Sequence, residues 1–533
     1  MALHDTVNAV RRWRSWLPAR RRAGAVGNTE VANARRLADA ERIGGGCPDG
    51  CAWLDDRTVD DLDLPLVFRA IDRTATPTGA QALWRWLVAP AVRLDVLAAR
   101  ERGLARLTAH PALCGQLRDA LAGHAESDAP HLPRLLWEPP HGPLRIGMFA
   151  ALSGLVIALG VLSVWWPPLV LACAALFIAN VLIDDWASIR LAPQAHALSV
   201  LARVLGSTQR VVADRLWEDA EIAADLVVLL PLRKRIAWLT VKDPFGLADL
   251  VRGGLLARLL LLGGAMRVIE RERARFRRVV LWLGEIDALV SIASLRTERA
   301  DARLPELAAG PARISAHGLV HPAITEAVGN DIVLDTGLIV TGSNMSGKST
   351  FLRTLAINAI CAQSIHTTFG SWHASLFRVF AVMRSSDALA DGMSKYAVEV
   401  AAIGKLVAAV SCEDRQLPAL LVVDEPFSGT NPALRVPIVV EVLDHLARRD
   451  LAIAATHDLD VAAQVGPRFV RAYFREPDDR TGQFDRKLRP GVSPGSNALA
   501  LLIRAGYPQE IIAAVERRVT ETSGELETRI PVP

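Results

Sequence analysis

Residues 341–350 read TGSNMSGKST and directly follow the apolar run IVLDTGLIV (332–340). Gly342 and Gly347 bound a G-x-x-x-x-G-K-S pattern at this predicted strand-to-helix junction. Glycines let the backbone approach phosphate groups, whose charge is met by N–H groups and by the positive end of the helix. The pattern therefore predicts a phosphate-binding loop, rather than an ordinary glycine-rich turn, made by Gly342, Ser343, Asn344, Met345, Ser346, Gly347, Lys348, Ser349 and Thr350.

Two polar side chains at the start of the predicted helix have different tasks in such a loop. Lys348 is expected to reach the β- and γ-phosphates of a nucleotide as a point charge and so to take part in catalysis. The hydroxyl of Ser349 is expected to complete the shell of a Mg²⁺ ion, which prefers hard oxygen ligands. The loop thus predicts a site for a nucleoside triphosphate and Mg²⁺.

Acidic and imidazole side chains follow two further apolar runs. LLVVDEP (420–426) contains Asp424, expected to hold Mg²⁺ through water, and Glu425, expected to polarise the attacking water as general base. LAIAATHDL (451–459) contains His457, which can contact the γ-phosphate or orient the water. A carboxylate pair that caps the next helix and a structural histidine are the plainer alternatives. Beside a phosphate loop, the pattern favours catalytic roles.

Apolar β-type runs alternate with helical patterns between residues 311 and 520. Strands are expected at DIVLDTGLIV (331–340), ALLVVD (419–424) and LAIAAT (451–456), with helices between them. This alternation is typical of an α/β domain with a mainly parallel sheet.

The part of the chain before this domain is predicted to be helical over residues 28–140 and 186–310. Between these segments, residues 146–183 contain no charged side chain, and two prolines divide the run. Its longer half would extend about 28 Å as a helix, close to the thickness of the hydrocarbon core of a bilayer. Residues 141–185 are therefore predicted to form a two-helix transmembrane hairpin. The alternative is a hairpin buried in a soluble core, whose outer face would carry polar residues.

The overall composition is that of a folded protein. The chain has 533 residues, of which 51% are apolar and 22% charged, with a net charge of +4, so it can bury a large core. Residues 1–27 form a basic arm and residues 521–533 a C-terminal tail. The run RVIERERARFRRVV (267–280) predicts a long exposed helix that is either solvated or faces DNA. Arginine abundance alone is weak evidence for nucleic acid binding.

Together, these segments resemble proteins of the MutS family. The loop interior Asn344–Met345 is close to that family's own phosphate loop, and DEPFSGTNP (424–432) is similar to its Walker B segment with a dimer-contacting turn. MRSSDALADGMSKYAVEVAAI (383–403) resembles the segment that carries the signature serine. Upstream, residues 62–107 resemble the family's lever domain, including the run Arg73–Gly79.

The resemblance implies an ABC-type ATPase domain, preceded by a helical lever, that uses ATP and Mg²⁺. It also implies a homodimer with composite sites, in which Ser394 of one subunit completes the phosphate loop of the other. The turn that contacts the partner would be Ser428, Gly429 and Thr430. Gln363 is a loose candidate for the Mg²⁺-contacting glutamine of such ATPases.

The sequence departs from the mismatch-reading members of the family. Those members insert a Phe-x-Glu motif of an N-terminal domain into the duplex, whereas the first phenylalanine here is Phe68, inside the lever-like region. The expected function is therefore a DNA-associated homodimeric ATPase that does not itself read mismatches. The alternative is a mechanochemical ATPase that acts on a protein or lipid. Residues 146–183 would place the protein at the inner (cytoplasmic) membrane with the ATPase domain in the cytoplasm; the other expectation is a cytoplasmic protein.

Overall fold

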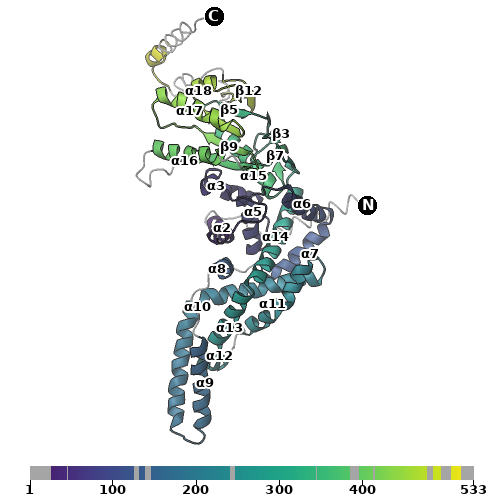
Figure 1. Ribbon diagram of the computed structural model, residues 1–533, viewed down its shortest axis with the longest axis vertical. Helices are drawn as coiled ribbons and strands as arrows, with labels where there is room; N and C mark the ends of the chain where they lie inside the picture. Colours follow the sequence, from purple (N-terminus) through teal and green to yellow (C-terminus); the bar gives the residue numbers. More distant parts are fainter. Residues whose placement is uncertain are drawn as a thin grey trace.

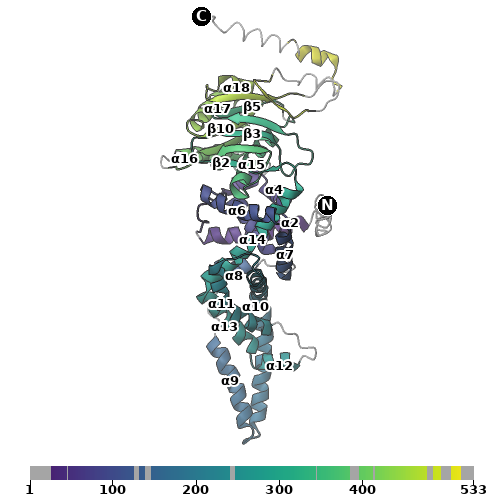
Figure 2. The ribbon, with the colours of Figure 1, turned by 90° about the vertical axis from the view of Figure 1, so that its right-hand side faces the viewer.

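The computed structural model describes residues 26–44, 46–124, 131–138, 146–239, 247–343, 345–383, 395–411, 415–476, 484–493, 506–515 and 517. Asn344 and Ser394, and most of the predicted basic arm, lie outside these residues. The molecule is elongated: strands and their covering helices lie at one end, a helical bundle lies in the middle, and two apolar helices extend from the other end (Figures 1 and 2).

The middle of the molecule is helical, as expected. Its helices are α2 (Val26–Ile43), α3 (Asp56–Asp61), α4 (Leu64–Ile71), α5 (Pro77–Val88), α6 (Leu94–Ala109), α7 (Pro111–Leu121), α8 (Leu132–Trp137), α11 (Ala220–Leu239), α12 (Leu247–Gly254), α13 (Ala257–Arg271) and α14 (Arg273–Glu298). Helix α14 packs along α5 and α6 and leads into the strands, so it connects the bundle to the α/β part.

The run Arg73–Gly79 forms the tight entry to α5. Asp287 of α14 is fully buried and accepts hydrogen bonds from the backbone N–H groups of Ala75 and Thr76 and from the Thr76 hydroxyl, at 2.6–3.0 Å. Burial raises the pKa of Asp287 more than these hydrogen bonds lower it, so that the pKa is about 6. A Cβ at Gly79 would lie 2.1 Å from the Asp287 carboxylate, so only glycine allows this approach.

Helices α9 (Ile146–Leu162) and α10 (Leu169–Ala213) form the apolar extension, called the arm below over residues 146–189. They lie side by side in both views and are joined by turns that contain the two prolines. The Cys173 thiol lies 3.5 Å from the Val156 carbonyl oxygen across this contact. Helix α10 has 45 residues, or about 67 Å of helix, and its second half packs against α11 and α7 inside the bundle.

The prediction of two membrane-spanning helices in residues 141–185 is correct for at most one helix. Among the described residues, one helix, Leu169–Ala213, is long and apolar enough to cross a membrane by length and composition. Helix α9 is also apolar but shorter, because the chain turns after Leu162. Only 11% of the most apolar window of α10 is buried, so the arm is not a buried core hairpin.

The charged run 267–280 is not one exposed helix. Helix α13 ends at Arg271 and α14 begins at Arg273, with Glu272 between them. Two arginines of this charged run bind within the bundle: Arg275 and Arg278 form ion pairs with the buried Asp225 of α11. These arginines neutralise an acidic residue of the bundle, which disfavours the prediction of a free DNA-facing surface.

The α/β end contains a mainly parallel sheet, as expected. Six strands have the order β12-β11-β5-β10-β9-β8, and all neighbours are parallel except β11 and β12. They are β5 (Gly337–Thr341), β8 (Arg378–Val382), β9 (Ala419–Asp424), β10 (Leu451–Thr456), β11 (Phe469–Phe474) and β12 (Leu488–Pro490). A four-stranded sheet joins β2 (Glu306–Ala308), β7 (Ser371–Ser375), β3 (Ile314–Leu319) and β4 (Asn330–Leu334), and β1 (Ala302–Arg303) pairs with β6 (Thr368–Phe369).

The run DIVLDTGLIV is not a single strand. Its first half belongs to β4 in the four-stranded sheet, and its second half is β5 in the six-stranded sheet. A bend at Asp335–Thr336 separates them. Alternating partly exposed residues in β4 and continuous burial in β5 agree with these different places.

Helices cover both faces of the six-stranded sheet. Helix α15 (Lys348–Ser364) lies on one face and shares a continuous apolar core with the helical bundle. The other face is covered by α16 (Lys395–Val410), α17 (Pro432–Leu446) and α18 (Leu459–Gln464), with a second core. Helix α15, which follows the predicted phosphate loop, is therefore the layer that joins the sheet to the bundle.

Candidate nucleotide-binding site

The predicted phosphate loop connects the buried strand β5 to helix α15. Gly342 has φ 139° and Gly347 has φ 112°, a backbone region that side chains with a Cβ rarely adopt. A Cβ at Gly342 would also lie 2.9 Å from the Ser346 hydroxyl and 3.0 Å from the carbonyl oxygen of Phe474. Met345 is 80% exposed at the tip of the loop. The two glycines are thus required by the shape of this turn.

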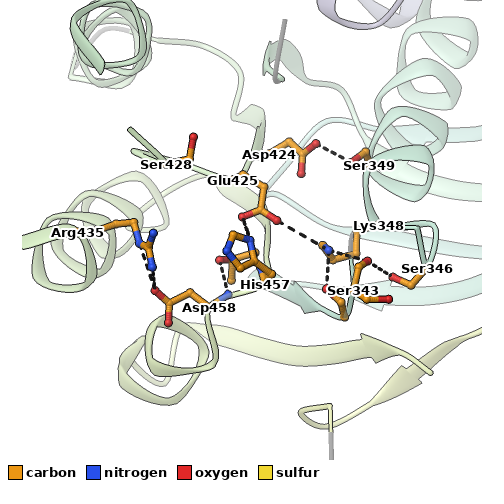
Figure 3. Close-up of polar contacts among 12 residues, drawn as sticks. Ser343, Ser346, Lys348, Ser349, Asp424, Glu425, Ser428, Arg435, His457 and Asp458 are labelled. Carbon is orange, nitrogen blue, oxygen red and sulfur yellow. Dashed lines mark hydrogen bonds and ion pairs between the residues drawn. The ribbon is translucent and has the colours of Figure 1, made fainter. Parts of the chain in front are cut away.

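Lys348 is buried at the start of α15 and points back across the loop. Its ammonium group donates hydrogen bonds to the carbonyl oxygens of Gly342 and Ser343, at 2.5 and 2.9 Å (Figure 3). The same nitrogen lies 3.8 Å from Oε1 of Glu425. A positive charge is therefore held between the loop and the carboxyl end of β9.

Ser349 and Asp424 meet beneath the loop. The Ser349 hydroxyl donates a 2.6 Å hydrogen bond to Oδ2 of Asp424, which is 7% exposed (Figure 3). A hydroxyl and a carboxylate are hard oxygen donors of the kind that Mg²⁺ takes beside nucleotide phosphates. The residues present therefore fit this metal.

Glu425 and His457 lie together because β9 and β10 are parallel neighbours whose carboxyl ends meet at one edge of the sheet. Oε2 of Glu425 lies 2.6 Å from Nδ1 of His457. Glu425 has φ 50°, which is uncommon for a residue with a Cβ, and its N–H donates to the carbonyl oxygen of Ala455 at 2.9 Å. Oε1 is buried and accepts no hydrogen bond from the described part of the chain. The carboxylate thus retains an acceptor aimed into the site.

A hollow of about 220 Å³, counting space open to solvent, adjoins Glu425 and His457. It is lined by Glu425, Pro426, Ser428, Arg435, Val439, Thr456, His457 and Val461. Arg435 forms a 2.6 Å ion pair with Asp458, whose carboxylate also caps α18. The sequence alone does not predict this pair. Asp458 could have been found as a helix cap after β10, but nothing local indicates its arginine partner on α17.

The turn after β9 contacts the helix that follows the signature segment. The Ser428 hydroxyl donates a 3.0 Å hydrogen bond to Oε1 of Glu399 on α16, and a Cβ at Gly429 would lie 3.3 Å from the Tyr396 side chain. Thr430 closes the turn through its N–H and the Phe427 carbonyl.

Gln363 is not near the residues predicted to bind Mg²⁺, contrary to expectation. It lies 14 positions after Ser349 on α15, or about 21 Å along the helix. Its buried amide instead bonds the backbones of Ala91 and Phe377, at 2.9 Å each. It therefore joins the helical bundle to the strand side of the α/β end.

Comparison with known proteins agrees with this geometry. Residues 338–523 match the family model for MutS domain V. Proteins named DNA mismatch repair protein MutS are similar to the chain: that of Roseiflexus sp. (strain RS-1) is 29% identical over 283 residues, covering 50% of this chain and 25% of the relative. That of Thermus aquaticus is 30% identical over 257 residues, covering 46% and 30%. The C-terminal part of the chain thus resembles MutS domain V, and the matched region spans less than a third of these relatives.

Proposed function

We propose that this protein hydrolyses ATP with Mg²⁺ as a homodimer and that it acts on DNA. One observation carries the ATPase proposal: Lys348 and His457 both approach the Glu425 carboxylate at the carboxyl edge of the sheet. Oε1 of Glu425 lies 3.8 Å from the Lys348 nitrogen, and Oε2 lies 2.6 Å from Nδ1 of His457. The hydrogen-bonded Ser349–Asp424 pair belongs to the same site. Lys348 provides a positive charge for the phosphates, and Glu425 provides a base that His457 contacts. The Ser349–Asp424 pair provides two oxygen donors for a metal. Phosphoryl transfer needs such positioning and charge stabilisation above all else.

Nucleotide binding is assigned to the loop and to Lys348. The loop N–H groups and the start of α15 meet the phosphate charge, and Lys348 needs only to turn from the carbonyl oxygens of Gly342 and Ser343 toward the β- and γ-phosphates. Ser349 and Asp424 would hold Mg²⁺, which would supply positive charge to neutralise those phosphates. Thr350, Ser346 and Met345 complete the loop.

Hydrolysis is assigned to Glu425. Its carboxylate accepts a proton as a water oxygen attacks the γ-phosphorus, and the bond to the bridging oxygen of ADP breaks. His457 holds the carboxylate at Oε2, which leaves Oε1 for the water, and its imidazole is 46% exposed toward solvent, where it can contact the γ-phosphate.

The dimer proposal follows from the family resemblance and from the turn at Ser428. Ser394 would act on the partner's nucleotide, and the turn Ser428–Thr430 would face the partner. Within one subunit this turn bonds Glu399, five residues after Ser394. In each subunit, the turn that follows Glu425 would therefore be hydrogen-bonded to α16, the helix that follows the Ser394 acting on the partner's nucleotide. The division into a helical lever (28–140 and 186–310) and an ATPase domain (311–520) belongs to the same proposal.

Mixing two inactive variants tests the composite site. Lys348→Ala and Ser394→Ala should each abolish most phosphate release alone. A mixture should regain part of it, since one site of each mixed dimer has both groups intact. If Lys348→Ala released phosphate as fast as the native chain, the proposed nucleotide site would be contradicted. A mixture that stays inactive although mixed dimers form would remove the composite arrangement.

DNA as the partner rests on the relatives, which are mismatch-repair proteins by name. Phosphate release should increase with duplex, branched or single-stranded DNA at low salt, and binding should weaken steeply as salt rises. Detergent-purified full-length protein allows this measurement without removing the arm. Unchanged hydrolysis and no salt-sensitive binding for all three DNA forms would exclude DNA while leaving the ATPase proposal intact.

A second candidate is a membrane-anchored ATPase that acts on a protein or lipid, and the exposed arm favours it. Large apolar side chains are exposed along the arm: Met148, Leu155, Ile157, Val161, Leu162, Val164, Trp165, Trp166, Val170, Leu171, Ile178, Leu182, Trp186 and Ile189. Trp165 and Trp166 lie between α9 and α10, and Trp186 lies near the other end of the arm, as in helices with aromatic belts at both interfaces. So large an apolar surface indicates contact with a membrane or a partner.

This candidate places the protein at the inner membrane with the ATPase domain in the cytoplasm. The bilayer would take the apolar first part of α10, and the same continuous helix would carry movement between arm and bundle. Full-length protein should float with lipid vesicles and need detergent for extraction. Release of the intact chain by high salt or carbonate alone would exclude the anchor and favour a cytoplasmic protein.

A further inference from the structure

Helix α3 of the bundle covers the free edge of the six-stranded sheet. Strand β8 is the last strand on that side, so its outward N–H groups need partners. The N–H of Ala381 donates to the Thr58 hydroxyl at 3.0 Å, and that of Met383 donates to Oδ2 of Asp61 at 2.8 Å. Thr58 is fully buried and Asp61 is 6% exposed. Two side chains of the bundle thus replace a neighbouring strand.

The same helix also contacts α15, which follows the predicted phosphate loop. Nε of Arg353 on α15 donates to the Asp61 carbonyl oxygen at 3.1 Å. Arg353 lies four residues, about one helical turn, after Ser349. Asp61 therefore bridges two elements: through its backbone it bonds α15, and through its carboxylate it bonds the end of β8.

Those two elements lead directly to the predicted metal site. At the carboxyl end of β8, Val382 pairs with Val423, the residue before Asp424. Ser349 belongs to α15, and its hydroxyl meets Asp424 at 2.6 Å. A displacement of α3 would shift α15 and β8, and through them would change the spacing of Ser349 and Asp424.

The Asp61 bridge is itself firmly supported. Asp55 caps α3 by accepting from the Thr58 N–H at 2.8 Å and from the Thr58 hydroxyl at 2.7 Å. Nε of Arg57 lies 3.2 Å from Oδ2 of Asp61. Groups held from several sides transmit a displacement rather than absorb it.

We propose that Asp61 and Thr58 are positioning residues through which the helical bundle sets the Mg²⁺ site, so that movement of the bundle and Mg²⁺-nucleotide binding are coupled. This inference rests on the proposed ATPase function. It extends that function by naming the joint at which a lever would act. Coupling of this kind is reciprocal for binding free energies, so Mg²⁺-nucleotide should in turn strengthen the contact between α3 and β8.

The test compares full-length variants in binding of a fluorescent ATP analogue, with and without Mg²⁺. In Asp61→Ala and Thr58→Val, the Mg²⁺ concentration that gives half of the full Mg²⁺-dependent gain in analogue affinity should rise about tenfold. This factor is the lower end of the loss in metal affinity when a residue that supports a metal ligand is removed. Affinity without Mg²⁺ should stay the same. Asp61→Asn and Thr58→Ser keep an acceptor for the strand N–H and should restore the native Mg²⁺ response.

Controls separate this coupling from a merely structural role. Asp60→Ala changes the same helix at a side chain that is 71% exposed and should leave the Mg²⁺ response unchanged. Hydrogen exchange of the native chain should slow at Ala381 and Met383 when Mg²⁺ and the analogue are added together, but not with Mg²⁺ alone. If Asp61→Ala does not fold, Thr58→Val against Thr58→Ser makes the same comparison.

Two results overturn the inference while the proposed function stands. One is a native Mg²⁺ response in folded Asp61→Ala and Thr58→Val. The other is equal loss of affinity with and without Mg²⁺, which indicates general damage to the site. Failure of the native chain to bind the analogue under any condition would instead contradict the proposed function itself.

Discussion

Nδ1 of His457 lies 2.6 Å from Oε2 of Glu425, and the backbone N–H of His457 approaches the same oxygen at 3.4 Å. One carboxylate oxygen is therefore held by β10, while the other lies 3.8 Å from Lys348. The carboxylate is fixed from two strands and from the phosphate loop, at a residue whose backbone itself is in an uncommon conformation. That arrangement suits a base that has to act at one position.

Glu425→Gln should bind ATP but hydrolyse it about 10²–10⁴-fold more slowly, because the amide cannot accept the proton of the attacking water. Single-turnover phosphate release and binding of a fluorescent ATP analogue measure the two properties separately. Glu441→Gln, at an exposed position of α17, is the matched control and should behave as the native chain. Native turnover in Glu425→Gln would assign the base to another residue.

Gly79→Ala should destabilise the bundle by roughly 1–3 kcal/mol, as forced overpacking does, because its Cβ would lie 2.1 Å from the Asp287 carboxylate. Gly115→Ala is the control: it is exposed in helix α7 and has no atom within 4 Å of its new Cβ. That change should be neutral or gain about 0.5–1 kcal/mol. Urea unfolding followed by circular dichroism compares the two. Equal effects would contradict the close packing at Asp287.

Glu101→Gln should reveal a pH-dependent joint between bundle and α/β end. Burial alone would raise the pKa of Glu101, but hydrogen bonds from His366 and Arg296 and the charge of Arg296 lower it to about 2. The folded pKa lies below the unfolded value of 4.5, so the stability contributed by this carboxylate is present above about pH 4.5 and is lost as pH falls toward 2.

The free energy of unfolding should therefore differ most between native and Glu101→Gln chains near neutral pH, and the difference should shrink below about pH 4.5. Denaturant titrations at several pH values, down to the lowest at which both chains fold, measure this difference. A difference that is constant across that range would mean that the ion pair with Arg296, at 2.8 Å, does not contribute to stability.

Ile178→Arg should weaken association with lipid vesicles if the arm enters the bilayer. Ile178 is 59% exposed near the middle of the apolar part of α10, and an arginine at the centre of a bilayer costs about 2.5–3.5 kcal/mol on insertion scales. Leu434→Arg places the same charge at a side chain of α17 that is also 59% exposed and should not change vesicle binding. Flotation measures both. Equal binding of the two variants would contradict membrane insertion at Ile178.

The residues of the proposed nucleotide site could be singled out from the sequence because each part is local in the chain. Gly342, Gly347 and Lys348 lie within one turn, and Asp424 and His457 each follow a short apolar strand. Parallel strands place their carboxyl ends together, so such residues converge whatever the rest of the chain does. The apolar run 146–183 was likewise visible as composition, although its first helix proved shorter than its second.

The connections between these parts could not be predicted from the sequence. Asp61 bonds Met383 across 322 positions, and Gln363 bonds Ala91 across 272. The sequence near each residue contains no sign of its partner, because such bonds depend on which elements the fold brings to one place.

Local sequence thus determined which residues form the glycine-bounded turn between β5 and α15, which end the strands and which stretch is free of charge. Only the tertiary structure decided that IVLDTGLIV is shared between two sheets, that the charged run 267–280 neutralises Asp225, and that Asp61 lies between α15 and β8. Turns and strand ends obey short-range backbone constraints, whereas buried polar groups take the partners that close packing of distant segments provides.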